Sequence, residues 1–249
     1  MVVIRLVLIV LLLAPTTILA AEISFFCTDA LAPSIRELVP AFEKASGHRV
    51  KITVANAGTV AERLQSGEPA DLAIVLPPAW DRLRREGRID SNTRIVLGKV
   101  GLGAFVRIGA EKPDIRTVDA FKRAVLDAKS IAIRDPAQRS PVGTYMLGLF
   151  DRLALSNAVK PRLVLTTEPP YEEVINSKAE LGFSTLAEIA AQPRVALVGP
   201  LPGEIQSYNV FTVAIPVSSG QRAATNEFLQ FLMSDSSKAM LRSKGIDTD

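Results

Sequence analysis

Short apolar segments alternate with amphipathic segments along most of the chain. Ile23–Cys27, Val50–Val54 and Asp71–Val75 are apolar runs of strand length, and each is followed by a segment with helical periodicity. The apolar residues of the first such segment recur at helical spacing and so share one helix face: Leu31, Ile35, Leu38, Val39 and Phe42. Strands that alternate with helices in this way are typical of parallel sheets with helices on both faces.

The alternation continues in the second half of the chain. Further strands are predicted at Gly101–Val106, Ser130–Ile133, Arg162–Leu165, Leu181–Phe183, Val195–Val198 and Val210–Ile215. Further helices are predicted at Thr117–Asp127, from about Pro141, from about Tyr171, at Arg222–Met233 and at Ser236–Lys244.

We therefore predict an α/β protein of two lobes, with the ligand cleft between two mixed, mainly parallel sheets. If the last strand and helices pack on the first lobe, residues 22–106 and 207–249 form lobe 1, and residues 107–206 form lobe 2. Ligands of open α/β sheets bind beyond the carboxyl ends of the strands, and the site is expected there.

The first residues, 1–21, have the pattern of a secretory signal peptide. Arg5 precedes the apolar run Leu6–Leu13, and small residues offer a cleavage site near Ala20 or Ala21. An uncleaved membrane anchor is the alternative, but the apolar run is short for a span and Pro15 interrupts it. We expect a periplasmic protein.

The charge distribution argues against nucleic acid as a partner. The 29 Lys and Arg residues are interspersed with 26 Asp and Glu residues along the chain. The one basic run, Arg82 to Arg88, lies on a predicted helix, where Asp81 precedes it and Glu86 falls within it. A solvated helix face is favoured over a docking patch.

Several kinds of chemistry have no residues to support them. The chain has one histidine, His48, and one cysteine, Cys27, which is expected to be a buried apolar residue without a disulfide partner. These two residues cannot build a zinc site, and no motif for phosphate loops, dinucleotides or a nucleophilic serine is present. We predict a protein without catalytic activity, metal ligands or cofactors.

Small and hydroxyl residues gather where predicted strands lead into helices. A helix start leaves backbone N–H groups unpaired and carries partial positive charge, so it binds anions without catalytic side chains. For each hydroxyl residue the alternative is an ordinary helix cap. The candidates for ligand binding are Thr28, Asp29, Gly58, Thr59, Ser140, Val142, Gly143, Ser184 and Thr185.

Over nearly its whole mature length the chain resembles the periplasmic molybdate-binding proteins of ABC transporters, which are type II periplasmic binding proteins. The resemblance rests on Leu31–Gly47, Gly67–Ile74, Trp80, Pro141–Tyr145, Glu180–Phe183 and Phe228–Gly245. It implies an exported monomer that holds a small anion, such as molybdate or tungstate, with uncharged donors and delivers it to an ABC permease. A metal would enter only as part of such an oxyanion.

Residue by residue, the resemblance assigns the first ligand serine to Thr28, the second region to Gly58 and Thr59, and the helix-start amides to Val142 and its neighbours. Three features depart from the family. After Ile74 this chain has the segment Val75–Pro78, where the family usually has small polar residues. A family tyrosine is expected after the Leu181–Phe183 strand, where this chain has Ser184 and Thr185. The preceding helix also looks shortened, with Pro169 and Pro170 before Tyr171, a further candidate contact.

Two arginines flank the second-lobe junction. Arg134 and Arg139 would form surface pairs with Asp135 or another carboxylate, or one would clamp a carboxylate or other anion with its planar fork. The clamp would make the ligand something other than molybdate.

Taken with the resemblance, the predicted function is capture of a molybdate-like oxyanion by lobe closure. The alternative is a binding protein or sensor for another small anion, including an organic carboxylate, without a transport role.

Overall fold

The computed structural model describes residues 20–249. The predicted signal peptide lies outside the described residues except for Ala20 and Ala21. Among the helices of residues 20–249, none combines the length and apolar character needed to cross a membrane.

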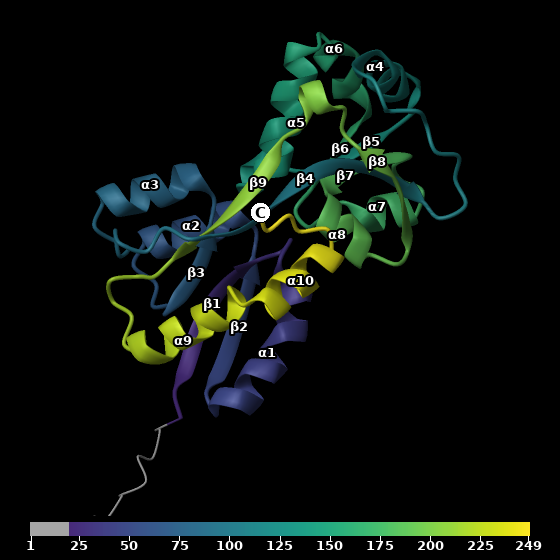
Figure 1. Cartoon of the computed structure of the whole chain (residues 1–249). Helices are drawn as coiled ribbons and strands as arrows, with labels where there is room; N and C mark the ends of the chain where they lie inside the picture. The colour runs from purple at the N-terminus through teal and green to yellow at the C-terminus, as the bar shows by residue number, and fades with distance from the viewer. Residues whose placement is uncertain (1–19) are drawn as a thin grey trace, which may run out of the picture.

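Lobe 1 is a mixed sheet covered by helices on both faces (Figure 1). Its strand order is β2–β1–β3–β9, where β1, β2 and β3 are parallel and β9 is antiparallel to β3. The strands are β1 (Glu22–Thr28), β2 (Arg49–Ala55), β3 (Leu72–Val75) and β9 (Tyr208–Ala214). The helices are α1 (Ala32–Ser46), α2 (Ala57–Gln65), α3 (Pro77–Arg85), α9 (Arg222–Leu232) and α10 (Asp235–Ser243).

Alternate residues of β1 face opposite helix layers. Phe25 belongs to the apolar cluster formed with α1, α9 and α10, whereas Phe26 belongs to the cluster formed with α2 and α3. Cys27 lies in the first cluster with no solvent exposure, which confirms that it is a buried apolar residue. Both faces of the sheet are therefore buried, as the near-continuous apolar strands predict.

Lobe 2 has the strand order β4–β7–β5–β6, with β8 paired to β4 outside this path. The strands are β4 (Val96–Arg107), β5 (Ile131–Arg134), β6 (Leu163–Thr166), β7 (Leu181–Thr185) and β8 (Val195–Pro200). The helices are α4 (Val118–Asp127), α5 (Pro141–Arg152), α6 (Ser156–Val159), α7 (Tyr171–Ile175) and α8 (Leu186–Ala191), with short 3-10 segments at Pro136–Gln138, Lys160–Arg162 and Gly203–Ile205.

The long strand β4 joins the two lobes. Its first part pairs with β9 and its second part pairs with β7 and β8, so one continuous sheet runs through both lobes. Four strand pairings are parallel and four are antiparallel, because β4 and β9 run antiparallel to their neighbours. The prediction that parallel pairings predominate is therefore wrong. The apolar cluster changes between Val100 and Leu102. The predicted lobe limits at residues 106 and 207 stay a prediction.

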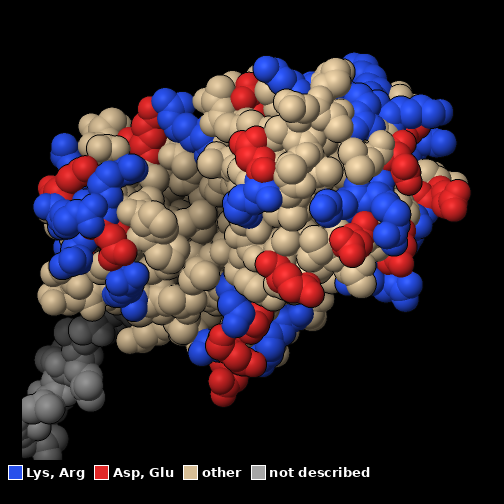
Figure 2. Space-filling view, turned by 90° about the horizontal axis from the view of Figure 1, so that it is seen from above, with Lys and Arg blue, Asp and Glu red and all other residues tan. Residues whose placement is uncertain are grey.

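The basic run on α3 lies on a solvated face. Arg82, Arg84 and Arg85 of α3 and Arg88 just beyond it are exposed, while Trp80 and Leu83 of α3 are buried. On the face shown in Figure 2, basic and acidic side chains are interspersed. The structure therefore agrees with an amphipathic surface helix whose charges face water.

Asp71 ties three parts of lobe 1 together. Its carboxylate accepts hydrogen bonds from the Ser24 amide at 2.9 Å, the Ser219 hydroxyl at 2.9 Å and the Gln221 amide at 3.2 Å. These donors come from β1 and from the turn before α9. The residue is 8% exposed, so water cannot replace these bonds at low cost.

Replacing Asp71 by Ala should lower the free energy of unfolding by about 2–3 kcal/mol, because buried donors then lose a charged acceptor. Urea denaturation of the mature protein measures the change. Asp81→Ala is the control: Asp81 forms an exposed pair with Arg94, and its loss should cost less than about 1 kcal/mol. Equal effects of the two substitutions would contradict the structural role of Asp71.

Candidate functional site

A small cavity lies between the lobes, at the carboxyl ends of β1 and β2. Its volume is about 40 Å³, room for a few water molecules or one small anion. A wider cavity of about 610 Å³, called the mouth, adjoins it and shares five lining residues with it: Asp29, Asn56, Arg134, Pro169 and Glu188. A ligand longer than an oxyanion can therefore extend from the inner cavity into the mouth.

Parallel pairing brings the ends of β1 and β2 to one edge. Thr28 is in register with Ala55, so Asn56 follows immediately beside it. Thr28 is 2% exposed, lines the inner cavity, and its hydroxyl has no partner among residues 20–249. It does not cap α1, whose cap position is Leu31. An unpartnered buried hydroxyl that lines a cavity is available to a ligand.

Two helices begin at the inner cavity, one from each lobe. Asn56 caps α2 by accepting from the Thr59 amide at 3.0 Å, and Ser140 caps α5 by accepting from the Gly143 amide at 3.0 Å. The cavity-lining Ala57 lies in the first turn of α2, where amides have no carbonyl partner within their own helix. Val142, the second residue of α5, also lines the cavity and lies in the first turn of its helix. The two helix starts supply donors and partial positive charge to the site.

The lobes touch through backbone at this point. The Asn56 side chain donates to the Gln138 carbonyl at 2.8 Å, which joins lobe 1 to lobe 2. Beside it, a Cβ atom added at Gly58 would lie 2.1 Å from the Arg139 carbonyl oxygen. Gly143 is equally confined, since its Cβ would lie 1.9 Å from the Arg134 carbonyl oxygen. These glycines permit close approach and do not line the inner cavity.

Arg134 brings a positive charge to the cavity. Its guanidinium pairs with Asp29 across the cleft, donates to the Thr167 carbonyl at 3.1 Å and lies 3.6 Å from the Glu168 carboxylate. The Arg134 side chain is only 14% exposed and that of Asp29 only 20%. The expected pairing with a carboxylate is present, but the partner is not Asp135, whose side chain caps the following 3-10 turn. Arg139 pairs instead with Glu62 at the mouth.

A second carboxyl group, that of Glu188, faces the cavity from lobe 2. It accepts from the Thr185 hydroxyl at 2.6 Å and the Ser184 hydroxyl at 3.1 Å, and Tyr171 donates to Ser184 at 3.0 Å. Burial raises the pKa of Glu188 above its ordinary value, and the charge of Asp29 adds to the rise. Burial likewise raises the pKa of the Tyr171 hydroxyl. The protonated form of Glu188 is thus favoured more than in water.

The predicted site residues fall into two groups. Those that line the inner cavity are Thr28, Asp29, Arg134, Ser140, Val142 and Ser184. Those that lie beside it or at the mouth are Gly58, Thr59, Arg139, Gly143, Tyr171 and Thr185. Their roles in binding stay a prediction.

Sequence reasoning missed Asn56 and Glu188. Asn56 could have been found as a favoured capping residue directly after a strand. Glu188 stands three residues after Thr185, the spacing of a capping box, and the Glu188 amide does donate to the Thr185 hydroxyl at 3.3 Å. That spacing predicts the helix start, but it does not predict that the carboxyl group faces a cleft.

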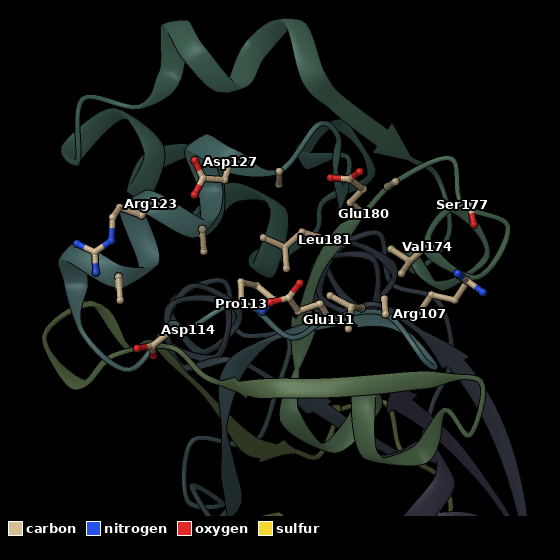
Figure 3. A pocket seen from close by; sticks show the side chains of 16 residues that line it. Arg107, Glu111, Pro113, Asp114, Arg123, Asp127, Val174, Ser177, Glu180 and Leu181 are labelled. Carbon is tan, nitrogen blue, oxygen red and sulfur yellow. The ribbon is translucent and has the colours of Figure 1, made fainter.

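A larger cavity of about 740 Å³ lies within lobe 2, between α4 and the segment that follows β4 (Figure 3). Apolar residues such as Leu181 and Val174 form its wall, and exposed charged residues, including Arg107, Glu111 and Asp127, stand at its rim. It contains no buried polar group that lacks a partner, among residues 20–249. The cleft between the lobes is therefore the stronger candidate.

A family model described as bacterial extracellular solute-binding protein matches residues 23–247. A Pseudomonas protein named aconitate isomerase is 34% identical over 245 residues, which cover 92% of this chain and 91% of that protein. The molybdate-binding protein ModA of Escherichia coli is 25% identical over 224 residues, which cover 85% of this chain and 83% of ModA.

Solved structures agree on the fold. The periplasmic molybdate-binding protein of Azotobacter vinelandii superposes with a TM-score of 0.74 at 20% identity, over 90% of this chain and 98% of that one. The predicted resemblance and the two-lobed α/β fold are confirmed. These relatives are mainly binding proteins, as predicted, but the one named aconitate isomerase requires that enzymatic activity be tested.

Replacing Gly58 by Ala should keep the lobes from reaching the closed arrangement, because the added methyl group would collide with the Arg139 carbonyl. Small-angle X-ray scattering should then give a larger radius of gyration than for the unmodified protein. Gly148→Ala, in the interior of α5 with its nearest neighbour atom 3.5 Å from the new Cβ, should leave the radius unchanged. A closed Gly58→Ala protein would refute this contact.

Proposed function

The chain belongs to the bacterial extracellular solute-binding protein family, and we propose that its ligand is a small organic carboxylate held in the cleft between its lobes. Members of this family are exported and present solutes to ABC permeases, and such a permease is the proposed membrane partner. Closure of the lobes around the ligand would shift the population toward a closed state.

The observation that carries this proposal is the position of Arg134. A largely buried guanidinium lines both the inner cavity and the mouth, close to the start of α5. A planar fork of N–H donors matches a carboxylate in two parallel hydrogen bonds. A ligand carboxylate can compete with Asp29 for this guanidinium and gain the free donors at the helix starts.

The charged groups of the cleft favour a carboxylate over a molybdate-like oxyanion. The resemblance to molybdate-binding proteins implies neutral donors, whereas this cleft contains Arg134 together with the carboxyl groups of Asp29 and Glu188. Further positive charge stands at the mouth, on Arg36 and Arg139. Arg36 forms no ion pair among the residues that the structure describes. Positive groups at two depths suit a ligand with more than one carboxylate.

A second candidate function is isomerisation of an unsaturated tricarboxylate. The relative named aconitate isomerase covers almost the whole chain, and aconitate carries three carboxylates and a carbon–carbon double bond. A carboxyl group with a raised pKa inside the cleft is the observation that favours chemistry over binding alone.

A thermal-shift screen of the mature protein should separate the ligand classes. We expect cis-aconitate, trans-aconitate or citrate to raise stability by about 2.7 kcal/mol at a hundredfold excess over the dissociation constant. Molybdate, tungstate, sulfate and phosphate should have little effect. A shift with molybdate or tungstate alone would overturn the carboxylate proposal and favour the oxyanion alternative.

For the carboxylate that the screen identifies as the best ligand, Arg134→Ala should weaken binding about 30-fold. This loss corresponds to about 2 kcal/mol for one charge-assisted contact. Titration calorimetry measures the affinity. Arg194→Ala removes an arginine of an exposed pair with Glu172, outside both cavities, and should bind like the unmodified protein. An unchanged affinity in Arg134→Ala would eliminate the guanidinium as the anion contact.

The second function has its own assay. Incubation of the protein with cis-aconitate, followed by chromatography of the acids, should reveal trans-aconitate if the chain catalyses the isomerisation. Tight binding without interconversion would identify a carboxylate-binding protein that has no such activity.

A further inference from the structure

We propose that the closed cleft is an acid–base centre in which Glu188 and Asp29, one from each lobe, move a proton between two carbons of a bound unsaturated carboxylate. This inference rests on the proposed function, because the substrate must first bind in the cleft through Arg134.

Both carboxyl groups face the same small volume from opposite sides. Glu188, in α8 of lobe 2, and Asp29, after β1 of lobe 1, line the inner cavity and also the mouth. The charge of Asp29 contributes to the raised pKa of Glu188, as expected for like charges at close range. Glu188, whose surroundings favour the protonated form, can serve as the acid beside Asp29, the partner of Arg134, as the base.

The surroundings of Glu188 hold its carboxyl group in place. The Tyr171 hydroxyl donates to the Ser184 hydroxyl at 3.0 Å, and the Ser184 hydroxyl donates to the Glu188 carboxylate at 3.1 Å. The Thr185 hydroxyl donates a further hydrogen bond to Glu188 at 2.6 Å. The fixed donors all reach the same oxygen, Oε2. The other carboxyl oxygen, Oε1, accepts no hydrogen bond among residues 20–249 and is therefore the oxygen left to carry the acid proton.

Asp29 has a different partner. Its carboxylate pairs with the Arg134 guanidinium, which holds the negative charge close to the cavity. A substrate carboxylate that binds Arg134 takes over part of this pairing and brings its own carbon chain next to Asp29. The contact with Arg134 that binds the substrate then also positions the substrate next to Asp29, the base.

The reaction is a proton shift along three carbons. Asp29 removes a proton from the methylene carbon between a carboxylate and the double bond, and the electron pair moves into a new carbon–carbon double bond. The old double bond accepts the proton of Glu188 at its far carbon. One C–H bond breaks and one forms, so the substrate gains and loses nothing. Arg134 and the helix starts stabilise the negative charge that develops on the carboxylates.

After the shift, Asp29 carries a proton and Glu188 is ionised. Both side chains line the mouth, so the opened cleft lets water return the starting protonation states. This exchange predicts that the hydrogen placed on carbon comes from solvent and not from the substrate.

The test follows isomerisation of cis-aconitate in deuterium oxide by proton NMR. We expect trans-aconitate with one deuterium on carbon for each turnover, because acid and base are separate groups. Glu188→Gln and Asp29→Asn should each reduce the rate at least 100-fold, while both variants still bind trans-aconitate. Glu172→Gln, an exposed glutamate at the start of α7 that lines neither cavity, should keep the rate within twofold.

The pH profile gives a readout that a structural role would not move. The acid form of Glu188 is lost as pH rises through its raised pKa, so the rate in water should fall on that side. The charged or titratable groups that face Glu188 are Asp29, Arg134 and Tyr171.

The outcomes separate the two proposals. If aconitate isomers do not bind the unmodified protein, the proposed carboxylate function is wrong. If they bind tightly but neither interconvert nor exchange hydrogen, only the acid–base inference is overturned. Product that retains the original hydrogen, or full activity in Glu188→Gln or Asp29→Asn, also overturns the two-carboxyl assignment.

Discussion

One guanidinium and two carboxyl groups line the same partly buried cavity, and much of the site depends on this excess of acidic over basic groups. Arg134 of lobe 2 pairs with Asp29 of lobe 1, so its charge is already matched before the second carboxyl group of lobe 2, that of Glu188, is counted. Burial and the Asp29 charge together disfavour a second carboxylate. A proton on Glu188 would restore the balance of charge, and the proposed carboxylate ligand would change it by competing with Asp29 for Arg134. In the proposed function, binding, closure and protonation would therefore be linked in this cleft.

The fold creates this arrangement because it gathers residues distant in the chain at one edge. Parallel pairing of β1 and β2 sets Thr28 beside Asn56, and the crossing strand β4 fixes lobe 2 so that α5 begins opposite them. The contact of Asn56 with the Gln138 carbonyl and the close approach at Gly58 leave no room for a side chain there. The result is a cavity whose walls belong to both lobes.

The relatives show how one fold serves different ligands. The molybdate-binding proteins share the architecture, while the relative named aconitate isomerase is 34% identical over 92% of the chain. Architecture alone does not select among these ligands. In the proposed function the selection would fall to a few side chains, above all Arg134, Asp29 and Glu188, which line the cavity and introduce charge where the resemblance implies neutral donors.

Much of the fold could be predicted from the sequence. The period of the apolar residues located the strands and the long helices, including α1 and α9, because burial of one helix face or both sheet faces dictates that pattern. The short helices α6 and α8 were missed, since four to six residues contain too little of a period to recognise. The balance of parallel and antiparallel pairs was also missed, because pairing direction depends on how β4 and β9 cross between lobes.

The candidate site divides in the same way. The sequence by itself determined that hydroxyl and small residues follow the strands, since helix starts favour them whether or not a ligand binds. It could not determine that the Thr28 hydroxyl has no cap to make, or that Arg134 pairs with Asp29 and not with its neighbour Asp135. The contact between Arg134 and Asp29 joins residues 105 positions apart. Only the tertiary structure decided these features of the site. Ion pairs and hydrogen bonds depend on distance in space, and a local sequence pattern does not identify a partner that is distant in the chain.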